Sequence, residues 1–450
     1  MDKLFKALGA HAAAHVLLHA ALLTPPSVLS HTKLAAAFLP LIWSCHIYTW
    51  GFGLGYIALV HALWATELLM FRDPRKDFAL LHFGPPPPPV TIAEEKKDSE
   101  DEPVEVLSVS ASTDKNDIKN TTPTTNGSHR LAWTEPYPTS WYKRFIWVSK
   151  LVISFRYISW VTSSKQAVLY SSQPPPPSSK SRTTFVLQKL LLIAFCFGIM
   201  DVTNLYQYFD PYMQIETSID EAFPRRLGGF FATYHLDSLS PRFVRITVLG
   251  LQQYSVFTLM GAIPAALFVM LGGFGLVDDF WGRVENWPSV IGSPMAIAER
   301  GLRGFWGGFW HQWFRNLLTG PGKAISRAFD LPERSTTKYA IQIIVAFGLS
   351  NAIHSASLSK DIPKVSATRY ASFFWMQGAC VLYEMILVRA AALLGLNGPR
   401  PFWASIGLAI LRGTWVGLVL YHTVPVVQDE MTRVSRIFGL RPVYFLSLPE

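Results

Sequence analysis

Long apolar runs with few or no charges recur along the chain and alternate with shorter polar stretches. A run of about 20 such residues can cross the hydrocarbon core of a bilayer as a helix. The pattern predicts an all-α fold, a multi-pass transmembrane helical bundle with roughly seven to nine spans. In chain order, the candidate spans are Leu4–Leu23, Leu34–Trp50, Gly53–Met70, Val186–Val202, Val244–Leu276, Tyr339–Leu358, Ala371–Leu394 and Phe402–Val427.

Two features leave the number of spans open. The run Val244–Leu276 is too long for one untilted span, and Pro264 inside it could kink the helix. The segment Phe223–His235, with its two adjacent glycines, could form a short re-entrant or interfacial piece. The first run lacks a small-residue cleavage site and further spans follow it, so we expect it to be retained as a span.

Two polar stretches interrupt the apolar pattern. Pro85–His129 and Ser171–Ser181 are rich in proline, serine and charge, which predicts solvated linkers. Between them, Trp133–Trp160 is aromatic and basic, which predicts an amphipathic element lying on the bilayer surface. We therefore divide the chain into N-terminal transmembrane helices (1–71), a largely disordered or amphipathic Pro-rich loop (72–184) and a transmembrane core (185–450).

Composition supports a membrane protein. Only 16% of the 450 residues are charged, whereas a soluble domain usually carries about 25%. The net charge of +9 fits cytosolic loops that face anionic lipid better than it fits nucleic-acid binding. The same positive field would also favour an anionic co-substrate.

The most unusual stretch is Trp281–Lys323, which is too polar for a span and too aromatic for an ordinary loop. If 302–318 is one helix, two faces result. One face carries Phe305, Trp306, Phe309, Trp310, Trp313 and Leu317, and the other carries Gly304, Gly307, Gly308, His311 and Arg315. The second face could be a groove for an anionic cofactor, or a tight helix–helix contact around a hydrogen-bonded histidine. Geometry alone slightly favours the contact.

A second candidate is His354, in the far half of an apolar run. Ser350 and Asn351 precede it by four and three residues and Ser357 follows it by three, so the four polar groups form one stripe on the helix. Burial disfavours imidazolium, so His354 should be neutral and able to accept a proton, with Asn351 or Ser350 holding its tautomer. A structural histidine in an interhelical hydrogen bond fits this pattern equally well.

Three other histidines, His11, His15 and His19, follow one another at intervals of four and share a helix face. Such spacing resembles a metal array, but no carboxylate or cysteine accompanies it, so we expect an interfacial or helix-packing role and no metal. His46 and His61 also lie in apolar runs and receive no role. The chain contains neither a GxSxG elbow nor a phosphate-binding GxxxxGK[ST] loop.

Together the two candidate motifs resemble a known family. Residues 287–294 (WPSVIGSP) and 301–312 (GLRGFWGGFWHQ) closely resemble the S-L-R-x-F-W-G-R-x-W-H-Q signature of wax-synthase-like acyltransferases. Residues 347–354 (FGLSNAIH) resemble the later F-x-x-S-G-x-x-H motif of that family. The resemblance covers roughly 254–426. The chain departs from the pattern at Gly301 (usually Ser), Gly308 (usually Arg) and Asn351 (usually Gly).

This resemblance implies a membrane-bound O-acyltransferase (MBOAT-like) fold with an internal reaction chamber, in which 185–450 is the acyltransferase core. By carry-over, His354 is the catalytic base and His311 is the second site residue, and Asn351 could help to stabilise the oxyanion. The acyl-CoA site would include the motif's aromatic and basic residues, namely Arg303, Phe305, Trp306, Trp310, Gln312 and Arg315. No permanently bound cofactor and no nucleic acid are expected.

Fungal members of this group often acetylate alcohols in secondary metabolism. We therefore expect transfer of an acetyl group from acetyl-CoA to a hydrophobic, terpenoid- or polyketide-like alcohol at the endoplasmic reticulum membrane. A long-chain wax or sterol ester synthase is the alternative within the same class. A multi-pass transporter lined by His354, or an inactive scaffold, would be the alternatives in other classes.

Overall fold

The computed structural model of the chain describes residues 2–50, 54–83, 132–162, 181–214, 218–236, 238–333, 335–356, 358, 366–396, 398 and 401–437. Helices dominate these residues, as the apolar pattern predicted. The two polar stretches expected to be linkers fall in 84–131 and 163–180, almost wholly outside the described residues.

Each of the eight predicted spans coincides with most of one helix, or of two consecutive helices. They are α1 (Asp2–Leu23), α2 (His31–Thr49), α3 (Gly55–Thr66) with the π-helix η2 (Glu67–Phe71), α7 (Arg182–Phe209), α10 (Pro241–Gly273), α14 (Thr336–Ser355), α15 (Ala367–Leu393) and α16 (Phe402–Ile437). Helices α7 and α16 continue well beyond the predicted ends at Val202 and Val427. Within the described residues, five helices are long and apolar enough to cross a membrane, namely α1, α7, α10, α15 and α16. Crossing by α2, α3 and α14 stays a prediction.

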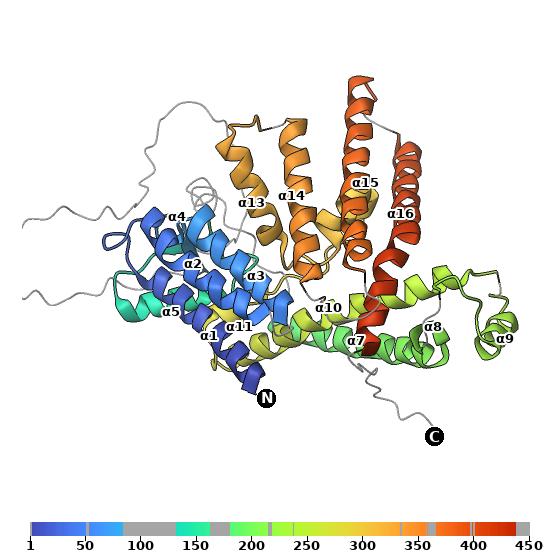
Figure 1. Ribbon diagram of the computed structural model, residues 1–450, viewed down its shortest axis with the longest axis horizontal. Coiled ribbons are helices and arrows are strands. Elements are labelled where there is room, and N and C mark those ends of the chain that lie inside the picture. The colour runs from blue at the N-terminus through green and yellow to red at the C-terminus, as the bar shows by residue number, and fades with distance from the viewer. Residues whose placement is uncertain are drawn as a thin grey trace, which may run out of the picture.

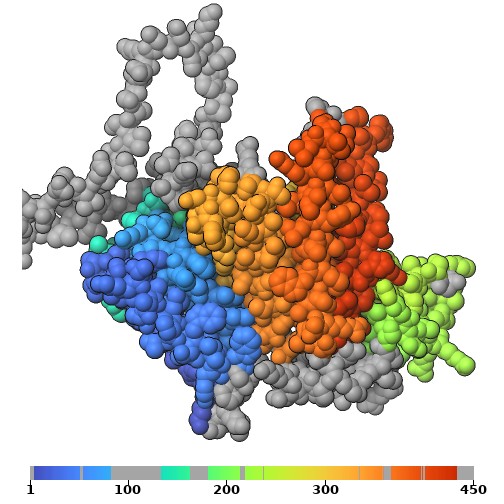
Figure 2. All heavy atoms as spheres, turned by 45° about the horizontal axis from the view of Figure 1, so that its top comes forward, coloured from blue at the N-terminus to red at the C-terminus, as the bar shows by residue number. Residues whose placement is uncertain are grey.

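The helices form two neighbouring groups (Figure 1). One group holds α1, α2 and α3 with the short helix α5 (Trp141–Val152). In the other, α13 (Arg315–Ala328), α14, α15 and α16 stand side by side in chain order, each packed on the next. The long pair α7 and α10 runs across the base of this row (Figure 1). Figure 2 shows the N-terminal helices adjoining α13 and α14 at the surface of the molecule.

A small sheet fastens the N-terminal group. Its order is β2 (Ala132–Pro136), β1 (Ala79–Phe83), β3 (Trp160–Val161), and both pairings are antiparallel. Trp147 and Trp160 are fully buried against the N-terminal helices, and Trp64 Nε1 donates to the carbonyl oxygen of Val152 at 2.7 Å. Trp147 and Trp160, from the described part of 72–184, therefore pack into the N-terminal core, while the division of the chain into three parts stays a prediction.

The remaining short elements connect these groups. They are α4 (Pro74–Asp77), α8 (Pro211–Gln214), α9 (Arg225–Thr233), α11 (Asp279–Gly282), the 3₁₀ turn η3 (Val284–Asn286), α12 (Met295–Gly304) and the π-helix η4 (Phe305–Phe309). The helix α9 coincides with the predicted interfacial piece, and it buries Leu227 and Phe231. Helix α10 continues through Pro264 without a break in its assignment.

A buried ion pair fixes α7 against α10. Asp210 ends α7, and its two carboxylate oxygens accept hydrogen bonds from Nε and Nη2 of Arg245 in α10, both at 2.8 Å. Neither side chain is exposed to solvent. The remaining guanidinium nitrogen donates to backbone carbonyls of the 218–221 turn, so the charge is both paired and hydrogen-bonded.

Candidate active site

The Trp-rich signature segment does not form one continuous helix, so the predicted single helix over 302–318 is wrong. Helix α12 gives way to the π-helix η4 at Phe305, the backbone becomes extended at Trp310, and α13 begins only at Arg315. The break starts at Gly301, whose φ of +58° lies in the region that favours glycine. There the carboxylate of Glu384, in α15, accepts a hydrogen bond from the backbone N–H of Leu302 at 2.7 Å.

At two of the glycines in the signature segment, the chain folds back so closely on itself that a side chain would not fit. A Cβ added at Gly304 would lie 1.7 Å from the carbonyl oxygen of Ala296. A Cβ at Gly308 would lie 2.5 Å from Nη2 of Arg300. The guanidinium of Arg300 thus occupies the space beside Gly308, the position where the resembled motif carries its own arginine. The third, Gly307, meets nothing within 4 Å.

The aromatic residues of the motif anchor it between helices. Trp306 Nε1 donates to Oε1 of Gln377 in α15 at 3.0 Å, and Gln377 in turn donates to Thr423 of α16 at 2.6 Å. Phe305 and Trp310 stack with ring centroids 5.7 Å apart, and this pair packs against α15 and α16. These contacts account for the packing of the motif without a ligand, so a role in binding acyl-CoA stays a prediction for Phe305, Trp306 and Trp310.

Gln312 likewise closes the loop. Its backbone N–H donates to the carbonyl oxygen of Val290 at 2.8 Å, and its side-chain amide donates to that of Trp310 at 2.6 Å. A further bond joins Gly292 N–H to the carbonyl oxygen of Phe309 at 2.8 Å. The loop before α12 and the loop after η4 are therefore tied together, which holds residue 311 in one place.

His311 lies in this tied loop, against α10. Its ring stacks on Phe257 with centroids 4.6 Å apart, and its Nδ1 is buried with no hydrogen-bond partner among the described residues. Burial, and then the proximity of His354, lower the pKa of His311 from 6.5 to about 4. A neutral imidazole with an unused polar atom is therefore available in an aromatic surrounding.

His354 lies near the end of α14, as predicted. Its ring stacks on Phe374 of α15 at 5.1 Å and lies 5.8 Å from the ring of Tyr56 in α3. The Oδ1 atom of Asn351, one turn earlier, accepts a hydrogen bond from Ser355 at 2.9 Å. Asn351 thus lies about one turn before His354 on the same helix, and Ser357, the last member of the predicted stripe, lies outside the described residues.

The fold brings the two histidines together through shared aromatic neighbours. Phe314 lies 6.0 Å from His311 and 6.3 Å from Tyr56, which itself contacts His354. A Cβ at Gly55 would lie 2.1 Å from the carbonyl oxygen of Ala356, so α3 begins directly against the end of α14. Sequence reasoning missed Tyr56, Phe257 and Phe374, because they come from elements far along the chain from either motif.

A pocket of about 470 Å³ opens next to the histidine pair. Its lining is mainly apolar and includes Tyr56 and Phe314, the two rings that lie between the histidines. Four polar residues also line it, namely His61, Ser154, Arg156 and Asn286. An apolar pocket with a few polar groups is typical of sites for small hydrophobic ligands.

Basic residues gather on the neighbouring surface. Arg315, at the start of α13, is exposed and close enough to lower the pKa of both Arg156 and Lys323, although burial is the larger cause for each. Arg72 and Arg327 add to the effect on Lys323, and Glu67 opposes it. Of the predicted basic residues, Arg315 thus belongs to a cationic group. Arg303 lies exposed on α12.

Comparison with known proteins gives a family match for one part of the chain. Residues 287–376 match the model of the membrane bound O-acyl transferase family, and this range contains both His311 and His354. This part of the chain is therefore similar to the membrane-bound O-acyltransferases. No solved structure matches the chain significantly.

The similar curated proteins are all described as acetyltransferases. An acetyltransferase of Arthrobotrys oligospora is 24% identical over 49% of this chain and 43% of its own length. The acetyltransferase eriL of Hericium erinaceus is 23% identical over 65% of this chain and 68% of its length. The acetyltransferase ple2 of Rhodocybe pseudopiperita is 24% identical over 59% and 62% respectively. The matched region thus spans about half to two thirds of these relatives.

Proposed function

We propose that the chain is an acyl-CoA-dependent O-acyltransferase that transfers an acetyl group to the hydroxyl of a hydrophobic alcohol. The single observation that carries this proposal is the pairing of His311 and His354 beside a largely apolar pocket. The names of the relatives support acetyl-CoA as the donor. We further place the reaction in secondary metabolism at the endoplasmic reticulum membrane, with a terpenoid- or polyketide-like acceptor.

The proposed reaction is a direct transfer in a ternary complex. Neutral His354 accepts the proton of the acceptor hydroxyl while that oxygen attacks the thioester carbonyl. His311, with its unused Nδ1, or Asn351 stabilises the oxyanion that forms. The intermediate collapses with cleavage of the C–S bond, and the proton held by His354 passes to the sulfur. The products are the ester and CoA, and no covalent acyl-enzyme forms.

The surroundings suggest where each substrate binds. The 470 Å³ pocket suits a hydrophobic alcohol, because its polar groups are few and its walls are aromatic. The cationic group around Arg315 suits the phosphates of CoA. Its positive side chains repel one another, and a bound anion would reduce that repulsion. Tyr56 and Phe314 lie between the pocket and the histidines, so the two substrates would meet at that point.

The test is acyl transfer by membranes that contain the full-length chain, with labelled acetyl-CoA and a panel of hydrophobic alcohols. We expect His354→Ala to lower the rate at least about a thousandfold, since general-base catalysis contributes roughly 10²–10⁴. His422→Ala is the matched control, because His422 also lies in a long apolar helix but is exposed and contacts Tyr421. Near-normal transfer by His354→Ala, at equal protein levels, would remove the assignment.

The same preparation separates the alternative functions. A preference for palmitoyl-CoA over acetyl-CoA would indicate a long-chain ester synthase. Flux of an alcohol across vesicles without any CoA, lost in His354→Ala, would indicate a transporter. The tied, Trp-rich loop that holds His311 next to His354 favours the enzyme, because a transport path needs no such second group.

A further inference from the structure

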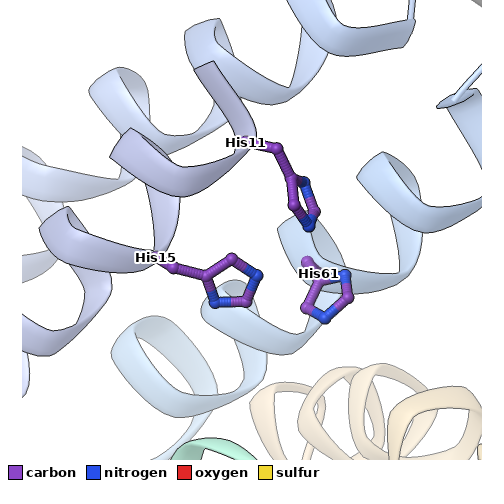
Figure 3. Close-up of side chains that lie close together, drawn as sticks. All are labelled: His11, His15 and His61. Atoms are coloured by element: carbon purple, nitrogen blue, oxygen red, sulfur yellow. The ribbon is translucent and has the colours of Figure 1, made fainter. Parts of the chain in front are cut away.

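Four histidines that the proposed reaction does not use converge in the N-terminal helices. His11 and His15 lie one turn apart on α1, His46 comes from α2 and His61 from α3. Figure 3 shows the rings of His11, His15 and His61 pointing toward one another. Their centroids are 4.6 to 5.0 Å apart, and one ligand nitrogen from each of the three can be chosen so that all lie within 4.8 Å of one another.

Hydrogen bonding leaves suitable lone pairs in this cluster. Nδ1 of His61 lies 2.8 Å from the carbonyl oxygen of Ile57, which can only accept, so Nδ1 carries the proton and Nε2 of the neutral ring has a free lone pair. Nδ1 of His11 and Nδ1 of His46 are buried with no partner among the described residues. Buried polar atoms without partners are destabilising unless something binds them.

We propose that His11, His15 and His61 form a binding site for a divalent transition metal ion of the zinc type. Two histidines at i and i+4 on one helix face, completed by a third from another element, is a usual arrangement for such an ion. The fourth position is open to His46, whose ring centroid lies 5.3 Å from that of His11. A small movement of the side chains would bring the nitrogens to the roughly 3.3 Å separation that tetrahedral coordination at about 2.0–2.1 Å requires.

The ligand set determines which ion fits. Neutral imidazoles suit Zn²⁺, Cu²⁺, Ni²⁺ and Co²⁺, whereas Ca²⁺ and Mg²⁺ need the oxygen ligands that this cluster lacks. This site revises the helix-packing role expected from the spacing of His11, His15 and His19. His19 is not part of it, because its ring faces Phe145 and only the nitrogens of His11, His15 and His61 come together.

The consequence for the molecule is a link between α1 and α3 next to the reaction chamber. Tyr56, which contacts His354, lies on α3 a little more than one turn before His61, and both residues line the same pocket. A metal bound at His61 would therefore fix the helix that forms one wall of the pocket. The inference does not depend on the proposed acyl transfer, because metal content can be measured without it.

The test is metal analysis of the full-length chain in detergent, purified through a tag without histidines. After incubation with Zn²⁺ and removal of free ion, we expect about one Zn²⁺ per chain. His15→Ala and His61→Ala should each lower this content at least tenfold, and His19→Ala, on the same helix, should keep it. Substitution with Co²⁺ should give the visible absorption of a tetrahedral Co²⁺ complex in the parent chain and in His19→Ala alone.

Thermal unfolding guards against variants that lose metal by misfolding. In the parent chain, a strong chelator should lower Tm and Zn²⁺ should restore it, whereas Mg²⁺ should not. His61→Ala should have the same Tm with and without chelator. A parent chain that binds less than a tenth of an equivalent of Zn²⁺ or Co²⁺, or an equal loss in His19→Ala, would overturn the proposal.

Discussion

His311 and Phe257 show how single residues set the chemistry of the candidate site. The imidazole is stacked on an aromatic ring and held by a loop whose backbone is tied at Val290 and Phe309. Burial in such a place disfavours the charged form, so the ring stays neutral where an exposed histidine would be partly protonated. The orientation of a neutral donor and acceptor is thereby fixed before substrate arrives.

This environment predicts an acid-tolerant pH profile. Because the pKa of His311 is lowered from 6.5 to about 4, its neutral form persists as pH falls and is lost only near the lowered value. We expect kcat/KM for acetyl transfer to change little on this account between about pH 5.5 and 8. Initial rates across that range, compared with those of Phe257→Ala, provide the measurement. A halving of the rate near pH 6.5, assigned to His311 by its loss in His311→Gln, would contradict this expectation.

The backbone conformation of Gly301 leads to a second prediction, which concerns stability. Its φ of +58° suits glycine, and a Cβ there would lie 2.7 Å from the carboxylate of Glu384. Gly301→Ala should lower stability by about 1–3 kcal/mol and reduce activity, because the turn that leads into the signature would be strained. Gly307→Ala is the control, because a Cβ at Gly307 meets open space. Melting temperatures in detergent distinguish them, and equal values for both variants would count against the strain.

The sequence was most informative about residues whose positions depend on neighbours close to them in the chain. His354 and Asn351 share a helix face as their spacing predicted, and His311 lies in a buried turn close to His354. Tyr56, Phe257 and Phe374 complete the surroundings, yet each is an ordinary aromatic residue in an apolar run. Only the packing of α3, α10 and α15 makes them neighbours of the histidines, and no local pattern reports such packing.

At the scale of elements, the hydrophobic periodicity predicted where helices lie but not where they are interrupted. The apolar runs gave all the long helices, because in a bilayer the backbone has few alternatives to a helix. The same reasoning failed over 302–318, where the pattern fits a helix but the backbone does not. The deciding contacts are the hydrogen bond from Leu302 to Glu384 and the tie between Gly292 and Phe309, and both involve partners outside that window.

The junction of α7 and α10 carries a prediction at this scale. Arg245→Ala should destabilise the protein by about 3–5 kcal/mol, because it leaves the carboxylate of Asp210 buried and unpaired. Arg242, three residues earlier on the same helix, pairs with Asp220 near the surface, and its loss should cost at most about 1 kcal/mol. Thermal unfolding of both variants in detergent measures the difference. A Tm for Arg245→Ala as high as that for Arg242→Ala would show that the buried pair is unimportant.

For the whole molecule, the distribution of charge bears on substrate binding. Arg72, Arg315 and Arg327 each act on Lys323, Arg315 also acts on Arg156, and the carboxylate of Glu67 lies close to Arg72, Lys323 and Arg327. They come from three separate parts of the chain, so only the assembled fold concentrates them. A positive field of this kind raises the rate at which an anionic substrate associates, and salt screens it.

This field predicts the behaviour of Arg315→Ala. The variant should raise KM for acetyl-CoA several-fold with little change in kcat, because the arginine acts on binding. Its KM should also rise less steeply with salt than that of the parent chain. Arg226→Ala, an exposed arginine on the distant helix α9, is the control (Figure 1). Initial rates at two salt concentrations provide the measurement, and an unchanged KM in Arg315→Ala would place the CoA phosphates elsewhere.

The antiparallel pairing of β1 with β2 has a consequence for how the chain can be altered. Phe83 is the register partner of Ala132, so the backbone leaves the N-terminal core and re-enters it at adjacent positions. Whatever connects these two points has to satisfy only a short end-to-end separation, and the free energy of closing such a connection changes slowly with its length. The joint between residues 83 and 132 is thus a natural place to graft a reporter domain or to shorten the polypeptide without disturbing the paired strands.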